Sequence, residues 1–115
     1  MIGDFDPVRH VGSSALEKSH VVSASPCRLY RATVLNTGAS AAYLLIFDST
    51  ASIAALEGTA PSRTPIPVAA GQPNGDEWPI RPTQFTTGCV LALSSTPATL
   101  TLIAGSEGWF DAEVQ

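Results

Sequence analysis

The residues of this chain that could carry out chemistry are few and widely spaced. The two histidines, His10 and His20, lie near the start of the chain. A zinc site needs at least three protein ligands, and no third ligand stands at a suitable spacing from them. Asp4 and Asp6 could offer oxygen atoms to a hard cation, but such a site takes about six or more oxygens. The sequence therefore predicts no metal site and no cofactor.

The serines and carboxylates also form no recognisable catalytic pattern. A G-x-S-x-G motif and a phosphate-binding loop are both absent from the sequence, and the single lysine is Lys18. The acidic pairs Asp76/Glu77 and Glu107/Asp111 could serve in glycoside hydrolysis, but turns favour these residue types for backbone reasons. We therefore expect a protein that is not an enzyme, and we predict no catalytic residue.

Trp78 and Trp109 are the aromatic residues most open to a binding role. Aromatic faces stack on sugar rings in lectin-like sandwiches, so these tryptophans could form a glycan platform. Aromatic side chains also bury large areas, and the prediction we favour is that the two residues cap the two ends of the core. A third alternative places one of them in an interface between subunits, where Trp is enriched.

Composition and charge exclude some classes of protein. The chain has 115 residues, which suits one domain, and only 14% of them are charged against an average of about 25%. The net charge is −4, and the six basic residues are scattered along the chain. Nucleic-acid binding normally needs a basic stripe, so we expect no nucleic-acid partner. A surface poor in charge is suited to contact with other proteins.

Cys27 and Cys89 are the two cysteines of the chain. Two cysteines are too few for a disulfide framework or for a four-cysteine zinc site. Both stand beside predicted strands, so we expect buried, reduced cysteines that pack as small apolar side chains. The alternative is one disulfide between strands, which would need Cα atoms within about 7 Å of each other.

The start of the chain shows no apolar stretch of the kind that directs secretion. No run approaches the roughly 18 apolar residues of a membrane-spanning helix. We therefore expect a protein that is made in a cytoplasm, is not secreted by a signal peptide and has no membrane partner.

Two regions are expected: an irregular N-terminal arm over residues 1–19 and a single β-sandwich domain over residues 20–115. The arm contains too few apolar residues to gain order by burial on its own. Phe5 and Val8 could anchor it on a neighbouring chain or on its own domain.

The run A-A-Y-L-L-I-F-D-S at 41–49 is the most apolar stretch of the chain. Its length and composition predict a strand that is buried on both faces. Turn residues separate it from a second predicted strand at 27–35, so we predict a hairpin between the two. In the strand at 27–35, alternation places Tyr30, Ala32 and Val34 on one face and Leu29, Arg31, Thr33 and Leu35 on the other.

The remaining elements are short and are divided by Gly, Pro and Asn. A short helix is predicted over residues 51–56, with Gly58 as its stop. Prolines at 65–70 indicate an edge strand, and residues 71–75 read as a turn. The spacing predicts an all-β, single-domain antiparallel β-sandwich or jelly roll of about eight short strands. The other predicted strands cover residues 20–24, 65–70, 77–85, 89–95, 98–104 and 109–114.

Several short motifs follow one another in a recognisable order. They are Leu29-Tyr30, Asn36-Thr37-Gly38-Ala39, Ala42-Tyr43-Leu44, Phe47-Asp48, Pro65-Ile66-Pro67-Val68, Ala70-Gly71, Phe85-Thr86-Thr87-Gly88, the run from Val90 to Ser95, the run from Ala98 to Thr101, and Trp109-Phe110-Asp111. In this order the motifs resemble small structural proteins encoded by tailed bacteriophages. The resemblance covers roughly residues 20–114 and leaves out the predicted arm.

The resemblance implies a virion component, namely a capsid decoration or cement protein that binds the outer capsid as a dimer or trimer. The partners it implies are the major capsid protein and further copies of this chain. A tail- or fibre-associated protein is the alternative within this class, and a glycan-binding, lectin-like module is the alternative outside it. The residue pattern indicates the candidate interface residues, which are Phe5, Val8, Leu29, Arg31, Trp78 and Trp109.

Overall fold

The computed structural model describes residues 8–78 and 81–115. In that part of the chain no helix is long and apolar enough to cross a membrane. The strands and the single short helix are β1 (Arg9–Gly12), β2 (Ser19–Ser23), β3 (Cys27–Asn36), β4 (Ala42–Phe47), α1 (Ile53–Leu56), β5 (Ile66–Val68), β6 (Pro73–Glu77), β7 (Thr83–Phe85), β8 (Cys89–Ser94) and β9 (Gly108–Val114).

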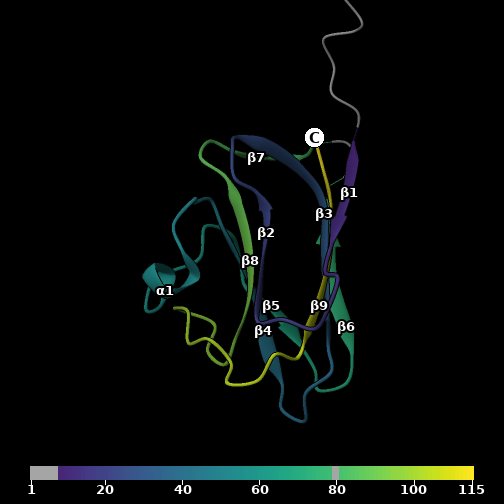
Figure 1. Ribbon diagram of the computed structural model, residues 1–115, viewed down its shortest axis with the longest axis vertical. Coiled ribbons are helices and arrows are strands. Elements are labelled where there is room, and N and C mark those ends of the chain that lie inside the picture. Colours follow the sequence, from purple (N-terminus) through teal and green to yellow (C-terminus); the bar gives the residue numbers. More distant parts are fainter. Residues whose placement is uncertain (1–7, 79–80) are drawn as a thin grey trace, which may run out of the picture.

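The strands form two antiparallel sheets that pack face to face (Figure 1). The first sheet has the order β1-β9-β3-β6, with β7 also paired to β3, and the second has the order β2-β8-β4-β5. The prediction of an all-β antiparallel sandwich is confirmed. Proline explains one edge: β5 is a three-residue strand with Pro67 at its centre, and it pairs on one side with β4.

The main core fills the space between the two sheets. The alternating residues of β9 that point inward are fully buried, while their neighbours are partly exposed, which is the pattern of a sheet with one face in the core. The largest fully buried side chains of this core include Leu29, Val34, Leu44, Ile46, Leu91, Leu93, Phe110 and Val114.

Strand β4 is buried on both faces, as its apolar run predicts. Leu44 and Ile46 belong to the core between the sheets, whereas Leu45 and Phe47 belong to a second cluster on the outer face of the same sheet. Strand β8 behaves in the same way, since all six of its residues are buried. The second sheet therefore has apolar side chains on both of its surfaces.

Two excursions of the chain itself cover that outer face. Helix α1 contributes Leu56, and the loop after β8 contributes Leu100. The two excursions are joined by backbone hydrogen bonds, from Gly58 to Leu100 (2.8 Å) and from Leu100 to Thr59 (2.9 Å). Figure 1 shows α1 beyond β8, on the side of the second sheet away from β3 and β9. The outer apolar cluster is thus covered without a partner chain.

Strands β3 and β4 do not form the predicted hairpin. They belong to different sheets, so the turn between them is an arch that crosses the sandwich. Asn36 holds this arch: its buried amide nitrogen donates to the carbonyl of Ser40 (2.9 Å), and its side-chain oxygen accepts from the amide of Gly38 (3.0 Å). A local turn pattern is the same for an arch and a hairpin, which is why the pairing was predicted wrongly.

A second polar fastening ties the end of β4 to the loop between β7 and β8. The Asp48 carboxylate accepts hydrogen bonds from the backbone amides of Thr86 (3.0 Å), Thr87 (2.9 Å) and Gly88 (3.3 Å). Burial alone would raise the pKa of Asp48, but these hydrogen bonds outweigh it and hold the pKa below the usual value.

Three further predictions were wrong. Residues 9–12 of the predicted arm form the edge strand β1, because they pair with β9 instead of remaining irregular. Residues 98–104 form a covering loop with one isolated bridge, from Leu102 to Ser94, since Leu100 finds its burial in the outer cluster. Residues 73–75, predicted as part of a turn, open strand β6, and the turn is made at Gly71 with φ of 70°.

We predict that Leu45→Asp unfolds the domain, because an unpaired buried charge costs several kcal/mol. The matched control is Val21→Asp on the same outer sheet face, where the side chain is 58% exposed. Circular dichroism and urea unfolding should show a native control and an unfolded Leu45 variant. A native Leu45→Asp protein would mean that the excursions do not cover this face.

We predict that Asp48→Ala lowers the free energy of unfolding by about 1–2 kcal/mol at pH 7, because hydrogen bonds to a charged acceptor are lost. The pKa of Asp48 is lowered in the folded state, so its contribution is complete above the unfolded pKa of about 3.9 and disappears as the pH falls through the lower folded value. Urea titrations at pH 7 and pH 3 check both points.

The control for this series is Asp76→Ala, since the Asp76 carboxylate accepts a bond from the amide of the next residue. Equal losses of stability for the two variants, or a difference between wild type and Asp48→Ala that grows toward pH 3, would contradict the role given to Asp48.

Candidate functional site

The outer face of the first sheet carries a distinctive set of side chains. Residues paired directly across a ladder point to the same side of a sheet. The register pairs Leu35 with Trp109 and with Pro73, Thr33 with Asp111 and with Gly75, and Arg31 with Glu113 and with Glu77. Because Ala32 and Val34 face the core, these rows face outward. We call this surface the β3–β9 face.

One end of the β3–β9 face is apolar. Leu35 is 38% exposed and Trp109 is 42% exposed, and they are direct ladder partners. Pro73, on the other side of Leu35, is exposed as well. Three adjacent strands therefore present a continuous row of apolar side chains to the outside, of the kind that marks a contact surface.

The other end of the β3–β9 face is charged. The Arg31 guanidinium donates to the carboxylate of Asp111 (3.0 Å) and lies 3.6 Å from that of Glu113. His10, from the edge strand β1, also contacts the Asp111 carboxylate. Glu77 is the ladder partner of Arg31 on β6. Two carboxylates thus lie against one guanidinium, a third stands on the neighbouring strand β6, and this end of the face is acidic.

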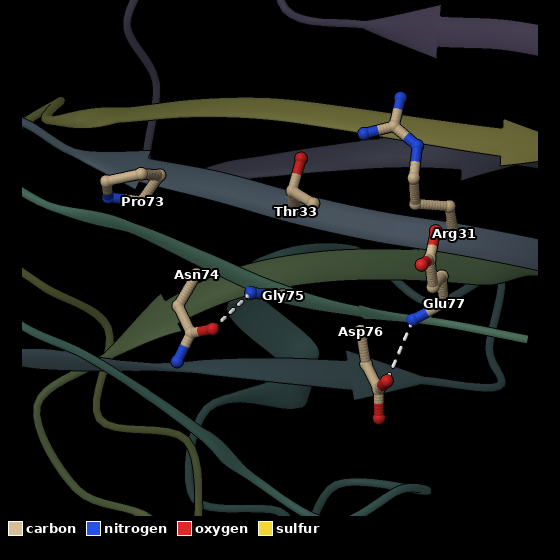
Figure 2. A pocket seen from close by; sticks show the side chains of 7 residues that line it. All are labelled: Arg31, Thr33, Pro73, Asn74, Gly75, Asp76 and Glu77. Atoms are coloured by element: carbon tan, nitrogen blue, oxygen red, sulfur yellow. Dashed lines mark hydrogen bonds between the residues drawn. The ribbon is translucent and has the colours of Figure 1, made fainter.

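An open hollow of about 410 Å³ lies between these two ends, over β3 and β6. Gly75 stands at its centre, where a side chain would overlap the carbonyl oxygen of Ala32. Figure 2 shows Arg31 and Thr33 on one side of the β6 backbone and Asn74 and Asp76 on the other. The hollow is open and shallow, which suits contact with a protuberance on a partner more than enclosure of a small molecule.

The chemistry available on this face is that of recognition. Arg31 is already neutralised by carboxylates, and the aromatic side chain of Trp109 lies at the opposite end of the face. Among residues 8–78 and 81–115, no group of three or more His, Cys, Asp and Glu side chains is placed to hold a metal ion. The face therefore offers apolar contact, hydrogen bonding and an acidic field.

A separate polar cluster contains a serine, a histidine and a glutamate but lacks the geometry of a catalytic triad. Ser13 donates to Glu17 (2.6 Å), and the His20 ring also bonds to Glu17 (2.9 Å). In a triad the serine would bond to the histidine. His20 stacks on Phe110 and is mostly buried. The cluster fastens the connection between β1 and β2.

The structure brings two of the predicted interface residues together. Arg31 and Trp109 both lie on the β3–β9 face. Trp78 is half-buried against the main core, as the prediction of a core cap required, whereas Trp109 is exposed and caps nothing. Val8 is 47% exposed just before β1. Phe5 lies outside the described residues.

The prediction that Leu29 is an interface residue was wrong. It is fully buried in the main core and offers no surface to a partner. Strict alternation placed it on the same face as Arg31, but the ladder between β3 and β9 shifts register between these two residues. Such a bulge turns the chain so that the residues on its two sides no longer follow one alternation.

Sequence reasoning did not select Leu35, Pro73 or Glu113 as interface residues. Leu35 could have been found, because it alternates with Arg31 and Thr33 along one strand. Pro73 carried no such signal, since it stood in a predicted turn. Its place beside Leu35 depends on the pairing of β6 with β3.

Comparison with family models, with curated proteins and with solved structures finds no match to this chain. The features that bear on function are therefore the β3–β9 face and the sequence motifs.

We predict that Gly75→Ala destabilises the domain by about 1–3 kcal/mol, the usual cost of overpacking. The added Cβ would overlap the carbonyl oxygen of Ala32 and the side chain of Thr33, and would force β6 away from β3. Thermal unfolding of the variant checks this. An unchanged midpoint would mean that β6 does not approach β3 at Gly75.

Proposed function

We propose that this chain is a non-enzymatic structural protein of a tailed-bacteriophage virion, a capsid decoration or cement protein that binds the outer capsid as an oligomer and stabilises it. The observation that carries the proposal is the uncovered β3–β9 face, with its exposed Trp109 beside Leu35. The opposite side of the sandwich is covered by α1 and the loop after β8. The molecule thus has one sheet surface free for a partner.

The chemistry of the face defines the partner surface. An exposed row of Leu35, Trp109 and Pro73 needs a flat apolar patch, and Trp is the residue type that most often anchors an interface. The acidic end around Asp111 and Glu113 needs basic side chains opposite it. The partner we propose is a surface of the major capsid protein that combines these two features.

The sequence resemblance supports the same class of protein through the fold. Its motif Phe47-Asp48 and its motif Phe85-Thr86-Thr87-Gly88 meet in the structure, where Asp48 accepts the amides of that loop. The motifs therefore describe how the sandwich is fastened. The binding surface is a separate matter, and the proposal for it depends on the β3–β9 face.

A homodimer or homotrimer is part of the proposal. Strand β1 is one edge of the first sheet and β2 is one edge of the second, and an open sheet edge can pair with a strand of another copy. The β3–β9 face is less suited to self-association, since two copies would bring acidic ends toward each other unless they were offset.

The second candidate function is glycan binding. The exposed indole of Trp109 lies in the row next to Asp111 and Thr33, so a sugar ring stacked on the indole would find polar groups beside it. A tail- or fibre-associated position in the virion would suit either kind of contact.

We predict that the purified protein co-sediments with capsids that lack it, saturating at a whole multiple of the capsid symmetry. Trp109→Ser should weaken this binding at least about tenfold, because truncation of an aromatic anchor of an interface costs about 2 kcal/mol or more. The matched control is Leu16→Ser, whose side chain is 47% exposed in the link between β1 and β2. Light scattering gives the free oligomeric mass.

Equal binding by wild type and both variants would exclude the β3–β9 face as the contact. Absence of any binding to heads, with a stable free oligomer, would reject the decoration role. Titration with glycans then decides the alternative, because quenching of tryptophan fluorescence in wild type and its loss in Trp109→Ser would assign a glycan site to this face.

A further inference from the structure

Cys27 and Cys89 lie in different sheets but in the same core cluster. Cys27 opens β3 in the first sheet and Cys89 opens β8 in the second. Both are buried, both carry free thiols, and both belong to the cluster between the sheets. A bond between them would join the two layers of the sandwich.

The topology forces these two residues together. Cys27 pairs with Phe85 in the ladder between β3 and β7, and Cys89 comes four residues after Phe85. In the other sheet Cys89 pairs with Ser23 of β2, and Cys27 comes four residues after Ser23. The chain therefore crosses between the sheets twice, from Phe85 to Cys89 and from Ser23 to Cys27. Both crossings place the two cysteines at the same end of the sandwich.

The two thiols interact directly, and the interaction makes them unequal. The hydrogen bond from Cys89, opposed by burial and helped by a bond from Ser23, lowers the pKa of Cys27 to about 7. The same hydrogen bond and burial raise the pKa of Cys89. A substantial share of Cys27 is thiolate near neutral pH, which is the reactive form of cysteine, while Cys89 keeps its proton.

Access to the pair is from the Cys27 side. Cys27 borders an open hollow of about 210 Å³ at the start of β3, together with Arg28 and Phe85. Cys89 is fully buried and is not part of that lining. A small oxidant that enters the hollow therefore reaches Cys27 before Cys89.

We propose that Cys27 and Cys89 form a peroxide-reactive dithiol site that closes into a disulfide between the two sheets. In the first step the Cys27 thiolate sulfur attacks one oxygen of hydrogen peroxide. The O–O bond breaks, hydroxide leaves and takes up a proton from solvent, and Cys27 becomes a sulfenic acid. This proposal is independent of the capsid role.

In the second step the sulfur of Cys89 attacks the sulfur of Cys27. The S–O bond breaks, and the leaving hydroxide takes the Cys89 proton to form water. The balance is two thiols and one hydrogen peroxide giving one disulfide and two waters. The disulfide closes the chain from residue 27 to residue 89 into a loop, and a cross-link of that length restricts the unfolded chain strongly.

The experiment treats the reduced full-length protein with hydrogen peroxide and follows intact mass and peptide maps. Wild type should lose two hydrogen atoms as one Cys27–Cys89 linked peptide, and its unfolding midpoint should rise by several degrees. The rate should increase as the pH rises through about 7, because the pKa of Cys27 controls the thiolate fraction.

Two variants separate the roles. Cys89→Ser should stop at the sulfenic acid of Cys27, which dimedone traps, because the resolving thiol is missing. Cys27→Ser should react at least about tenfold more slowly, since the remaining thiol is buried and protonated. If either variant fails to fold, the wild-type peptide map alone decides.

Three outcomes would overturn the proposal. The first is wild-type protein that keeps both thiols under peroxide while free cysteine in the same tube is oxidised. The second is a disulfide that forms only between chains. The third is oxidation of Cys27 beyond the sulfenic acid in wild type without any link to Cys89.

Discussion

The double burial of the second sheet is the constraint on which the rest of the structure depends. Leu45, Phe47 and Val90 point away from the first sheet, so they would meet water unless something covered them. The chain covers them itself, with α1 and the loop after β8, and fixes the cover by backbone bonds between Leu100 and its neighbours at 58–59. This choice makes the molecule asymmetric. One outer surface becomes a third layer, and the other, the β3–β9 face, stays open. The apolar run of β4 is covered inside the chain, and the surface left open is the one with mixed apolar and acidic character.

Polar fastenings explain why the two sheets keep this arrangement. Hydrophobic burial is non-directional, and it would tolerate a sheet that had slid along its neighbour. Asn36 lies before β4 and Asp48 lies after it, and each side chain is hydrogen-bonded to backbone groups that must lie in one place for the bonds to form. The Ser94 side chain, which is fully buried, does the same for the covering loop by bonding to the backbone at residues 96 and 101. The short sequence motifs that contain Asn36, Asp48 and Ser94 therefore fix the conformation of the connections between strands.

Much of the fold could be predicted from residue patterns, and the errors have physical causes. Three strands could be identified from the burial that their side chains require on one face or on both. They are the alternating stretch at 109–114 and the apolar runs at 42–47 and 89–94. The side chains of a strand do not determine which strand pairs with it, because the turn residues at 36–40 are compatible with an arch as well as with a hairpin. Residues 98–104 are predicted as a strand, yet a loop can bury Leu100 and Leu102 against an outer cluster equally well. The site was found only in part, because Arg31 and Trp109 carry their own signals whereas Leu29 was misplaced by a bulge that leaves no mark in composition.

The residues that hold the connections of the sandwich differ in role from the residues exposed on the β3–β9 face. A resemblance of motifs gives information about the first group only. A family whose members share arches and clamps shares a scaffold, and the residues that hold the scaffold are restricted by backbone geometry whatever the molecule binds. The β3–β9 face is under a different restriction. Its outward side chains are free to vary without loss of the fold, as exposed positions on a sheet usually are. The exposed tryptophan beside a leucine, on the same face as an arginine paired with two carboxylates, is not required by the sandwich. A side chain of that size placed where the fold gains little from it is the physical reason to propose a contact surface on this face.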